Sequence, residues 1–454
     1  MPRSVTQDRL SSGDDAVELA NIAQPAEAEW EPTTPKATYI KVVSAAFSFF
    51  VAGVNDGSLG ALIPYLIRSY DINTAMISIV YAVTFSGWFF AAISNSHLSQ
   101  YLDLGAMLVL GAFLQVLAHA LRCWTPPFAL FAVTFGIASL GQAYQDTHAN
   151  TFVASVKGAH RFLGLIHAMY SGGCLVGPFV STAIASADTP SRWSLFYTFP
   201  LGLGVMNLIL CVIAFWDSLA IKAKRPGNTE SGEGSRNEGA LLQIKETLKT
   251  PSVWLLSLFY FFYLGAVITA SGWVVEYLVE VRDGNLADMG YVPAGFNGGS
   301  FLGRLLLAEP THRWGERRML FIYSVIGVAL QLLFWLYVSM TPSQTVSDNR
   351  AAISVPNIVA ASVAISLLGF VLGPFFAAGI SVGSRLFSAQ VRSSALALVF
   401  VLGQIGGSIF PAITGIVAAH AGVKVLQPVL VALLAATGVS WLLVPKTSGL
   451  HHRD

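Results

Sequence analysis

Hydrophobic residues gather in twelve stretches that fill almost all of the chain between Ala37 and Val444. Each stretch is about 20 residues long or longer, which is the length that an α-helix needs to cross the hydrocarbon layer of a bilayer. A soluble chain would alternate shorter hydrophobic and polar segments. The predicted membrane-spanning helices are 39–67, 74–98, 104–124, 128–154, 162–186, 194–217, 252–279, 291–309, 319–340, 354–384, 393–419 and 426–444.

The connections between these helices divide the chain into two sets of six. Most connections are short, so consecutive helices should run antiparallel. The segment 218–251 is an exception, because its Gly, Ser, Pro and charged residues predict a flexible cytoplasmic linker. We therefore expect a six-helix bundle at 38–217 and a second at 252–444. The acidic segment 1–37 is predicted to be a disordered tail, and 445–454 a short tail.

Composition agrees with a membrane protein and argues against several other classes. Hydrophobic residues make up 54% of the chain and charged residues only 11%, against roughly a quarter in soluble domains. The net charge of +1 and the lack of a basic cluster among aromatic residues argue against a nucleic-acid partner. The dispersed cysteines Cys123, Cys174 and Cys211 have neither a disulfide pattern nor metal-ligand spacing. We expect no metal and no cofactor.

The distribution of lysine and arginine predicts the orientation of the chain. With a cytoplasmic N-terminus, 19 of these residues fall in inside segments and six in outside segments, and Arg304 lies within a span. Positive residues are enriched on the cytoplasmic side of membrane proteins. Both termini should therefore be cytoplasmic, and the plasma membrane is the default location.

A short internal repeat indicates that the two halves are related. The fifth predicted helix contains Gly172-Gly173 followed by Gly177-Pro178, and the eleventh contains Gly406-Gly407 followed by Pro411. Glycine allows helix backbones to approach closely, and proline allows a bend. Glycine–proline pairs also occur in membrane helices without a repeat. Related halves are the framework in which two bundles rock around a central binding site.

The loop 312–318, His-Arg-Trp-Gly-Glu-Arg-Arg, resembles the signature cytoplasmic loop of the major facilitator superfamily. His312 stands where the family usually has aspartate. The resemblance implies a gating role for Arg313, Gly315, Arg317 and Arg318, which would hold helix ends through charge pairs and helix dipoles. A plain cytoplasmic anchor would need the arginines but not the glycine. The corresponding loop of the first half lacks the basic residues.

A narrower resemblance connects the chain with fungal transporters of the fucose-permease-like branch. It rests on 53–64 in the first helix, 142–146 in the fourth and Gly272-Trp273 in the seventh. Asn297 departs from the pattern, where an aromatic residue is expected. The resemblance implies an all-α integral membrane fold of twelve helices in two pseudo-symmetric six-helix bundles, which functions as a monomer.

Asp56 is the first of three acidic candidates inside predicted spans. A charged residue at the centre of a membrane helix costs about 2.5–3.5 kcal/mol on insertion scales, so it marks function by default. Asp56 lies fifteen residues after Lys41 and twelve before Arg68, which places it near the middle of the membrane. An alternative is that Asn55-Asp56-Gly57 forms a break in the helix, because these residues favour turns.

Asp146 is the second candidate and belongs to a polar run on the fourth helix. Gln142, Asp146 and Asn150 recur every four residues and so share one side of the helix, and Gln145 and His148 widen this polar face. Such a face is unfavourable against lipid, so it should meet a polar cavity or partner helices. A purely structural hydrogen-bond network is the alternative.

Proton-coupled sugar symporters of the resembling branch use carboxylates on the first and fourth helices. Burial in a low-dielectric cavity raises the pKa of a carboxyl group, which suits it to carry protons. The hypothesis is that Asp146 is the proton carrier and that Asp56 is a substrate ligand or coupling partner. Glu276, the third candidate, is interpreted as a gate or surface residue as readily as a binding residue. The predicted substrate-binding residues are Asn55, Gln142, Gln145, Asn150, Tyr170, Asn297 and Gln404.

The favoured function is secondary active transport of a small organic solute coupled to protons. No nucleotide-binding P-loop motif is present, so ATP is not expected to drive it directly. The element Gly173-x-x-x-Gly177-Pro178 resembles one typical of proton antiporters, which slightly favours export. Sugar uptake by symport is the alternative.

Two functions of other classes, a membrane enzyme and a nutrient receptor, fit the sequence less well. A membrane enzyme would need catalytic groups that converge, but Asp146 and His148 are two residues apart on a helix and point in different directions. We expect no catalytic residues. A non-transporting nutrient receptor would usually carry a long cytoplasmic tail, and only about ten residues follow the last predicted helix. The expected partners are the substrate, protons and the lipid bilayer.

Overall fold

The structure is a computed structural model that describes residues 35–157, 159–220, 245–337, 355–388 and 391–446. The predicted disordered tail, most of the predicted linker and the end of the C-terminal tail lie outside the described residues. The chain divides into a unit of residues 1–40 and a unit of residues 41–454. The first unit is described only where helix α2 begins at Pro35. All contacts given below lie within the second unit.

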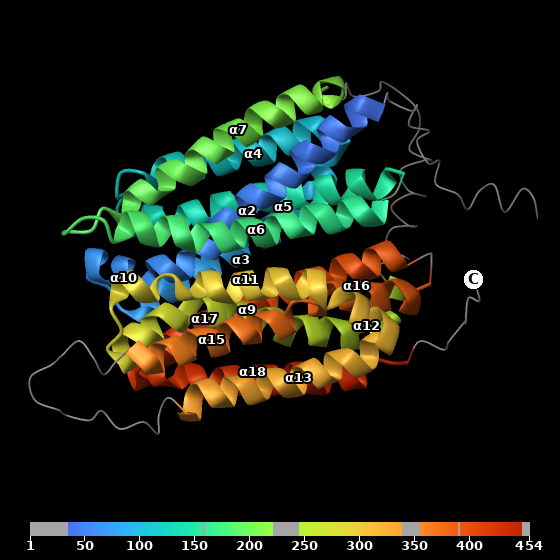
Figure 1. The fold of residues 1–454 in the computed structure, drawn as a ribbon. Helices are drawn as coiled ribbons and strands as arrows, with labels where there is room; N and C mark the ends of the chain where they lie inside the picture. The colour runs from blue at the N-terminus through green and yellow to red at the C-terminus, as the bar shows by residue number, and fades with distance from the viewer. Residues whose placement is uncertain (1–34, 158, 221–244, 338–354, 389–390, 447–454) are drawn as a thin grey trace, which may run out of the picture. The chain divides into compact units, whose positions relative to one another are not determined.

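The described residues form helices and no strands. The first set comprises α2 (Pro35–Tyr70), α3 (Thr74–Tyr101), α4 (Leu104–Arg122), α5 (Phe128–Ser155), α6 (Ala159–Ala185) and α7 (Thr198–Ala214). The second set comprises α9 (Pro251–Arg282), α11 (Val292–Leu306), α13 (Glu316–Leu332), α15 (Val355–Leu372), α16 (Phe375–Leu386), α17 (Arg392–Ala421) and α18 (Leu426–Leu443). Short elements between them include α10 (Leu286–Met289) and α12 (Ala308–Trp314). Helices of each set lie side by side (Figure 1).

Among the described residues, ten helical segments are long and hydrophobic enough to cross a membrane. The two other predicted spans correspond to α5 and α11. Helix α5 carries the polar run around Asp146, which lowers its hydropathy. Helix α11 ends after 15 residues at Leu306, and the chain continues in the short α12. Both departures arise where the sequence places polar or charged groups inside a span.

One predicted span is interrupted. The stretch 354–384 contains two helices, because α15 ends at Leu372 and α16 begins at Phe375. Pro374 lacks a backbone N–H and cannot continue the hydrogen-bond ladder. Two tyrosines of α9 bind carbonyl oxygens at this break: Tyr260 Oη donates to Phe376 O at 2.6 Å, and Tyr263 Oη donates to Leu372 O at 3.3 Å. Phe370 O, which the missing N–H of Pro374 would otherwise leave free, accepts a hydrogen bond from Gly373 N at 3.3 Å, so the bilayer's requirement for internal backbone partners is met there.

Close helix contacts through glycine recur in both halves. A Cβ atom on Gly173 of α6 would lie 2.2 Å from the carbonyl oxygen of Phe50 in α2. In the second half, a Cβ atom on Gly406 of α17 would lie 2.0 Å from the carbonyl oxygen of Phe261 in α9. Helix α6 therefore packs on α2 as α17 packs on α9. The internal repeat seen in the sequence corresponds to a repeated backbone contact.

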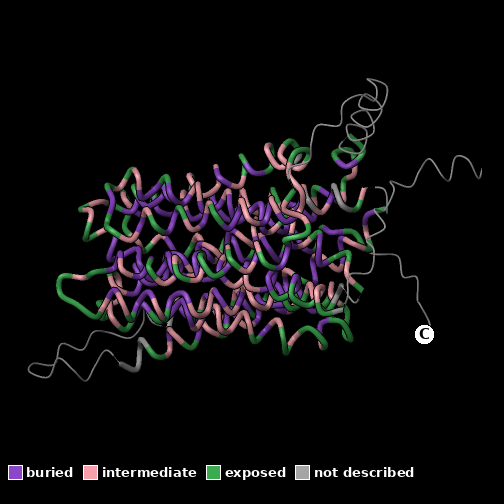
Figure 2. The backbone as a smooth tube through the Cα atoms, turned by 90° about the horizontal axis from the view of Figure 1, so that it is seen from above, coloured by how far each residue is buried: buried purple, intermediate pink, exposed green. Residues whose placement is uncertain are grey.

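The two sets of helices are joined by side-chain hydrogen bonds to backbone carbonyls. Thr74 Oγ1 donates to Gly415 O at 2.8 Å, and Ser78 Oγ donates to Ala412 O at 2.7 Å, so the beginning of α3 is tied to α17. Figure 2 shows that buried backbone runs through the helices of the second unit, with exposed residues gathered at their ends and on outer faces.

Candidate functional site

Asp56 lies at the centre of a polar cluster made by three helices. Its Oδ1 atom accepts hydrogen bonds from Asn55 Nδ2 and from Gln142 Nε2 of α5, both at 3.0 Å. Its Oδ2 atom accepts one from Tyr170 Oη of α6 at 2.9 Å. Asp56 is nevertheless an exposed residue, although it lies in the middle of α2. Asp56 also stays within a continuous helix, so the predicted alternative of a helix break is wrong.

A buried arginine continues this cluster. Arg122, the last residue of α4, donates from Nη1 to Asn55 Oδ1 at 2.9 Å and from Nε to Thr134 Oγ1 at 2.7 Å. Its guanidinium carbon lies 3.7 Å from the centre of the Phe135 ring. Arg122 has no exposed surface and forms no ion pair with any described residue. Asn55 therefore bridges a buried cation and the Asp56 carboxylate.

Arg122 was missed as a functional residue because it was counted as part of an outside segment. The signal was present in the sequence: Arg122 lies inside the predicted span 104–124. The neighbouring His119 is also buried, and both of its ring nitrogens lack a hydrogen-bond partner among the described residues.

Asp146 lies one helical turn beyond Gln142 on α5 and has fewer partners than Asp56. Its Oδ1 atom accepts a hydrogen bond from Asn150 Nδ2 at 3.3 Å, and Asn150 also donates to the backbone oxygen of Asp146. Asp146 is half-buried. No other described side chain is hydrogen-bonded to its carboxylate, so Oδ2 has room for a proton, a water molecule or a substrate group.

Gln145 belongs to a different network, on the side of α5 that faces α4 and α7. Its Oε1 atom accepts hydrogen bonds from Gln115 Nε2 at 2.7 Å and Asn207 Nδ2 at 3.1 Å. Its Nε2 atom donates to Leu108 O at 3.0 Å. Gln145 is buried and is 2% exposed. The structure therefore separates Gln145 from the Asp56 cluster.

The remaining predicted binding residues lie on the second set of helices. Asn297 of α11 donates from Nδ2 to the carbonyl oxygen of Cys174 in α6 at 2.9 Å and so links the two sets. Gln404 of α17 is half-buried. Glu276 of α9 is buried. None of these three is hydrogen-bonded to the Asp56 cluster among the described residues.

The predicted gating glycines contact α2 directly. A Cβ atom on Gly177 would lie 2.6 Å from Val54 O, and one on Gly57 would lie 2.5 Å from Cys174 O. Pro178 lies within α6, which remains continuous through it. The α2–α6 contact therefore runs alongside the Asp56 cluster, and a larger residue at these glycines would push the two helices apart.

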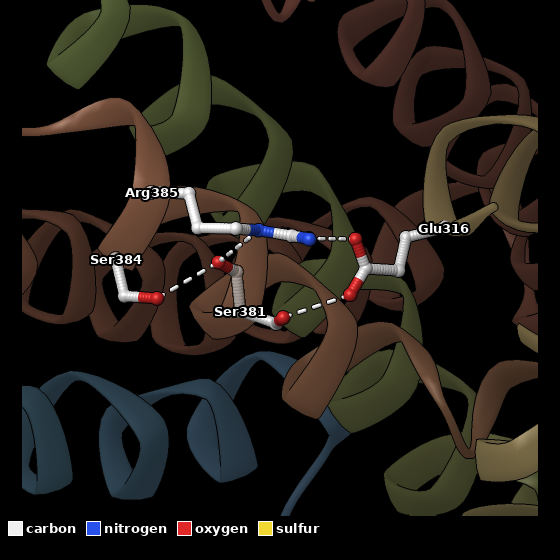
Figure 3. A network of polar contacts seen from close by, with 4 residues as sticks. All are labelled: Glu316, Ser381, Ser384 and Arg385. Atoms are coloured by element: carbon white, nitrogen blue, oxygen red, sulfur yellow. Dashed lines mark hydrogen bonds and ion pairs between the residues drawn. The ribbon is translucent and has the colours of Figure 1, made fainter. Parts of the chain in front are cut away.

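The loop between α12 and α13 connects three helix ends. Gly315 has φ of 90°, a conformation that favours glycine. Glu316 forms an ion pair with Arg385 of α16 and accepts a hydrogen bond from Ser381 Oγ at 2.7 Å (Figure 3). Arg317 donates to the carbonyl oxygens of Leu442, at 2.6 Å, and Val444 at the end of α18.

The other two arginines of this loop are directed to solvent. Arg313 pairs with Glu309 at 2.5 Å, and both side chains are largely exposed. Arg318 is exposed. The glycine register and the helix-end contacts implied by the resemblance are therefore present at Gly315 and Arg317. Glu316, which was not chosen as a site residue, makes the connection to α16.

These features define a helical membrane protein with a charged polar cluster inside its first set of helices. Residues 45–411 match the sequence profile of the Major Facilitator Superfamily, and the chain belongs to this family. The predicted family, all-α fold and similarity to fucose-permease-like transporters are confirmed. The protein is a multi-pass membrane protein of a secondary-transporter family and is not an enzyme.

Similar proteins extend over most of the chain. Bypass of stop codon protein 6 from Saccharomyces cerevisiae is 26% identical over 424 residues, which cover 90% of this chain and 82% of the yeast protein. The L-fucose-proton symporter of Escherichia coli is 22% identical over 311 residues, covering 63% of this chain and 70% of the symporter. A bacterial homologue of the human lysosomal transporter Spinster, crystallised inward-facing and unoccupied, has a TM-score of 0.67 at 13% identity. That match covers 91% of this chain and 97% of the bacterial chain.

Proposed function

We propose that the protein couples the movement of a small organic solute to protons and that the Asp56 cluster lines the transport pathway. The observation that carries this proposal is the exposure of Asp56 at mid-helix, with donors from three helices on its two oxygens. An ionisable group at this depth is too costly to place against lipid. The similarity to a bacterial L-fucose-proton symporter supports proton coupling.

The two aspartates have different surroundings, which supports different roles. Both oxygens of Asp56 are held by neighbouring donors, so this carboxylate is fixed in place and suited to orient a substrate group. Asp146 accepts one side-chain hydrogen bond, from Asn150, and can gain or lose a proton without breaking a larger network. We assign proton carriage to Asp146 and substrate coupling to Asp56. Asn55, Gln142 and Tyr170 hold Asp56 in this scheme.

The halves meet most clearly at one end of the helices. With both termini cytoplasmic, the bonds of Thr74 and Ser78 to α17 lie toward the outside, so they would close the pathway on that face. The loop around Gly315 and Arg317 then lies on the cytoplasmic face, where it would control opening. In this scheme the protein resides in the plasma membrane and functions as a monomer.

Export is the favoured direction. The element Gly173-x-x-x-Gly177-Pro178 lies along the close α2–α6 contact beside Asp56, where it would control opening and closing of the pathway. Uptake of a sugar by symport is the second candidate, which the similarity to the L-fucose-proton symporter favours. A receptor that does not transport is the alternative of another class. It predicts no dependence of solute distribution on Asp146.

The test compares metabolites inside and outside cells that lack the protein or express the wild type, Asp146→Asn or Asp188→Asn. Asp188 is an exposed loop residue outside the cluster and serves as the control. An exporter predicts that one compound accumulates inside both the deletion strain and the Asp146→Asn strain. A symporter predicts that a sugar remains in the medium of both. If Asp146→Asn cells match the wild type while the deletion strain differs, the assignment of Asp146 is wrong.

A further inference from the structure

Arg304 is an intramembrane arginine whose charge has no partner. It lies in the last turn of α11, which ends at Leu306, inside the predicted span 291–309. Its Nη1 atom donates to Ser171 Oγ at 2.6 Å and to the backbone oxygen of His167 at 3.5 Å. Both acceptors are uncharged. No carboxylate of the described residues lies within ion-pair distance of Arg304.

The donor capacity of Arg304 is also incompletely used. A guanidinium group has five N–H donors arranged in a planar fork. The Nε atom of Arg304 is buried and has no hydrogen-bond partner among the described residues. A buried, unsatisfied charged donor is costly. Binding of an anion would satisfy this donor and offset the cost. An arginine whose donors all have partners would gain no such stabilisation from an anion.

The surroundings of Arg304 come from both sets of helices. The Phe376 ring of α16 lies 6.0 Å from the guanidinium carbon. The His167 ring of α6 lies 5.6 Å from the Phe376 ring and 5.3 Å from the Phe49 ring of α2. Ser171, which accepts from Arg304, follows Tyr170, which donates to Asp56. Helix α6 therefore places the Arg304 site beside the Asp56 cluster, where the two halves meet.

We propose that Arg304 binds a carboxylate group of the transported solute, so that the substrate is an organic monoanion. The planar guanidinium fork matches the two oxygens of a carboxylate. A single unpaired guanidinium balances one negative charge, whereas a phosphate monoester carries nearly two near pH 7. The aromatic ring of Phe376 supplies an apolar wall for the remainder of the molecule. This inference rests on the proposed transport function and specifies its substrate.

The test measures thermal stabilisation of the purified full-length protein at constant ionic strength. The added compounds are lactate, gluconate and benzoate as monocarboxylates, glycerol 3-phosphate as a phosphate monoester, and L-fucose as a neutral sugar. The variants are Arg304→Gln, Arg304→Lys and the control Arg282→Gln, which removes a half-buried arginine at the end of α9. We expect at least one monocarboxylate to stabilise the wild type and the control. Binding should weaken about 10- to 100-fold in Arg304→Gln, the range of charged hydrogen bonds, and less in Arg304→Lys.

Three outcomes overturn the inference. They are stabilisation by no monocarboxylate, stabilisation by glycerol 3-phosphate alone, and carboxylate binding that is unchanged in Arg304→Gln. A purely structural contact between α6 and α11 would change transport rates in Arg304→Gln but leave the half-saturating carboxylate concentration unaltered. Failure of the proposed function is separately visible, because solute distribution would then be insensitive to Asp146→Asn while carboxylate binding still depended on Arg304.

Discussion

Two buried regions, one in each half, use different chemistry on the same backbone plan. Between α4, α5 and α7, Gln145 is hydrogen-bonded to Gln115 and Asn207. In the second half, the centre of α9 is aromatic: the Phe259 ring stacks on Tyr263 at 5.9 Å and meets Trp441 at 4.8 Å. One hydrogen-bonded pair, Gln331 with Gln427, is the polar counterpart there.

We expect this difference to give the two regions different tasks. Directional hydrogen bonds and charges in a low-dielectric interior fix where a proton or a polar group can bind. Packed aromatic rings bury large surfaces and favour few geometries, which suits a bundle that moves as one body. The Asp56 cluster belongs to the first half. The second half contributes Arg304 to the region where the halves meet.

The largest effect is expected from adding a methyl group at the shared glycine contacts. Gly173→Ala and Gly406→Ala each place a Cβ atom 2.0–2.2 Å from a backbone oxygen of the neighbouring helix, so the helices must move apart. Overpacking of this kind costs about 1–3 kcal/mol. Thermal unfolding in detergent should show a lower melting temperature for both variants. Gly172→Ala is the matched control, because no atom lies within 4 Å of its Cβ position. If Gly173→Ala were as stable as Gly172→Ala, the close glycine contact between α6 and α2 would be contradicted.

A smaller effect is expected from removing the polar network of the first half. Gln145→Leu deletes one side-chain donor and an acceptor shared by Gln115 and Asn207. Asn207 Nδ2 loses its acceptor, whereas Gln115 Nε2 keeps Gly111 O at 3.4 Å. Each buried unsatisfied group costs about 1–3 kcal/mol. The melting temperature should fall, while binding at the separate Asp56 cluster should persist. Equal stability of Gln145→Leu and the wild type would show that the first half does not depend on this network.

The smallest effects come from removing one hydroxyl group in each half. Ser324→Ala deletes a hydrogen bond from Ser324 Oγ to Leu320 O within α13 and should lower stability by no more than about 1 kcal/mol without altering transport. Tyr170→Phe deletes a hydrogen bond to the Asp56 carboxylate and should weaken transport about tenfold, the effect of one charged hydrogen bond. Stability and initial transport rates measured on both variants check this contrast. Equal transport rates of the two variants would contradict the expectation that the polar region of the first half binds the substrate.

The fold was predictable because hydrophobic length specifies membrane helices directly. The interruption after Leu372 was not predicted, although Gly373-Pro374 is visible in the sequence, because the hydrophobic stretch continues through it. A membrane span of uniform hydropathy gives no sign of where its backbone breaks. Tyr260 and Tyr263 bind the carbonyl oxygens of Phe376 and Leu372 near this break, but they precede these residues by 116 and 109 positions in the sequence.

The site was predictable only in part. Asp56, Gln142 and Tyr170 were each selected and lie together in the structure. Gln145 was predicted with them but faces other helices. It follows Gln142 by three residues, which places the two side chains about 60° apart around the helix axis. Periodicity alone does not tell which helix each side chain meets. Arg304 was recognised as lying inside a span, but its lack of a partner depends on the spatial arrangement of α6 and α11.

The break at Gly373-Pro374 has a mechanical consequence. It makes α16 a separate helix of 12 residues, about 18 Å long. Near one end, Phe376 faces Arg304, and near the other, Arg385 pairs with Glu316 of the cytoplasmic loop. Because one short helix makes both contacts, we expect a tilt of α16 to displace them together.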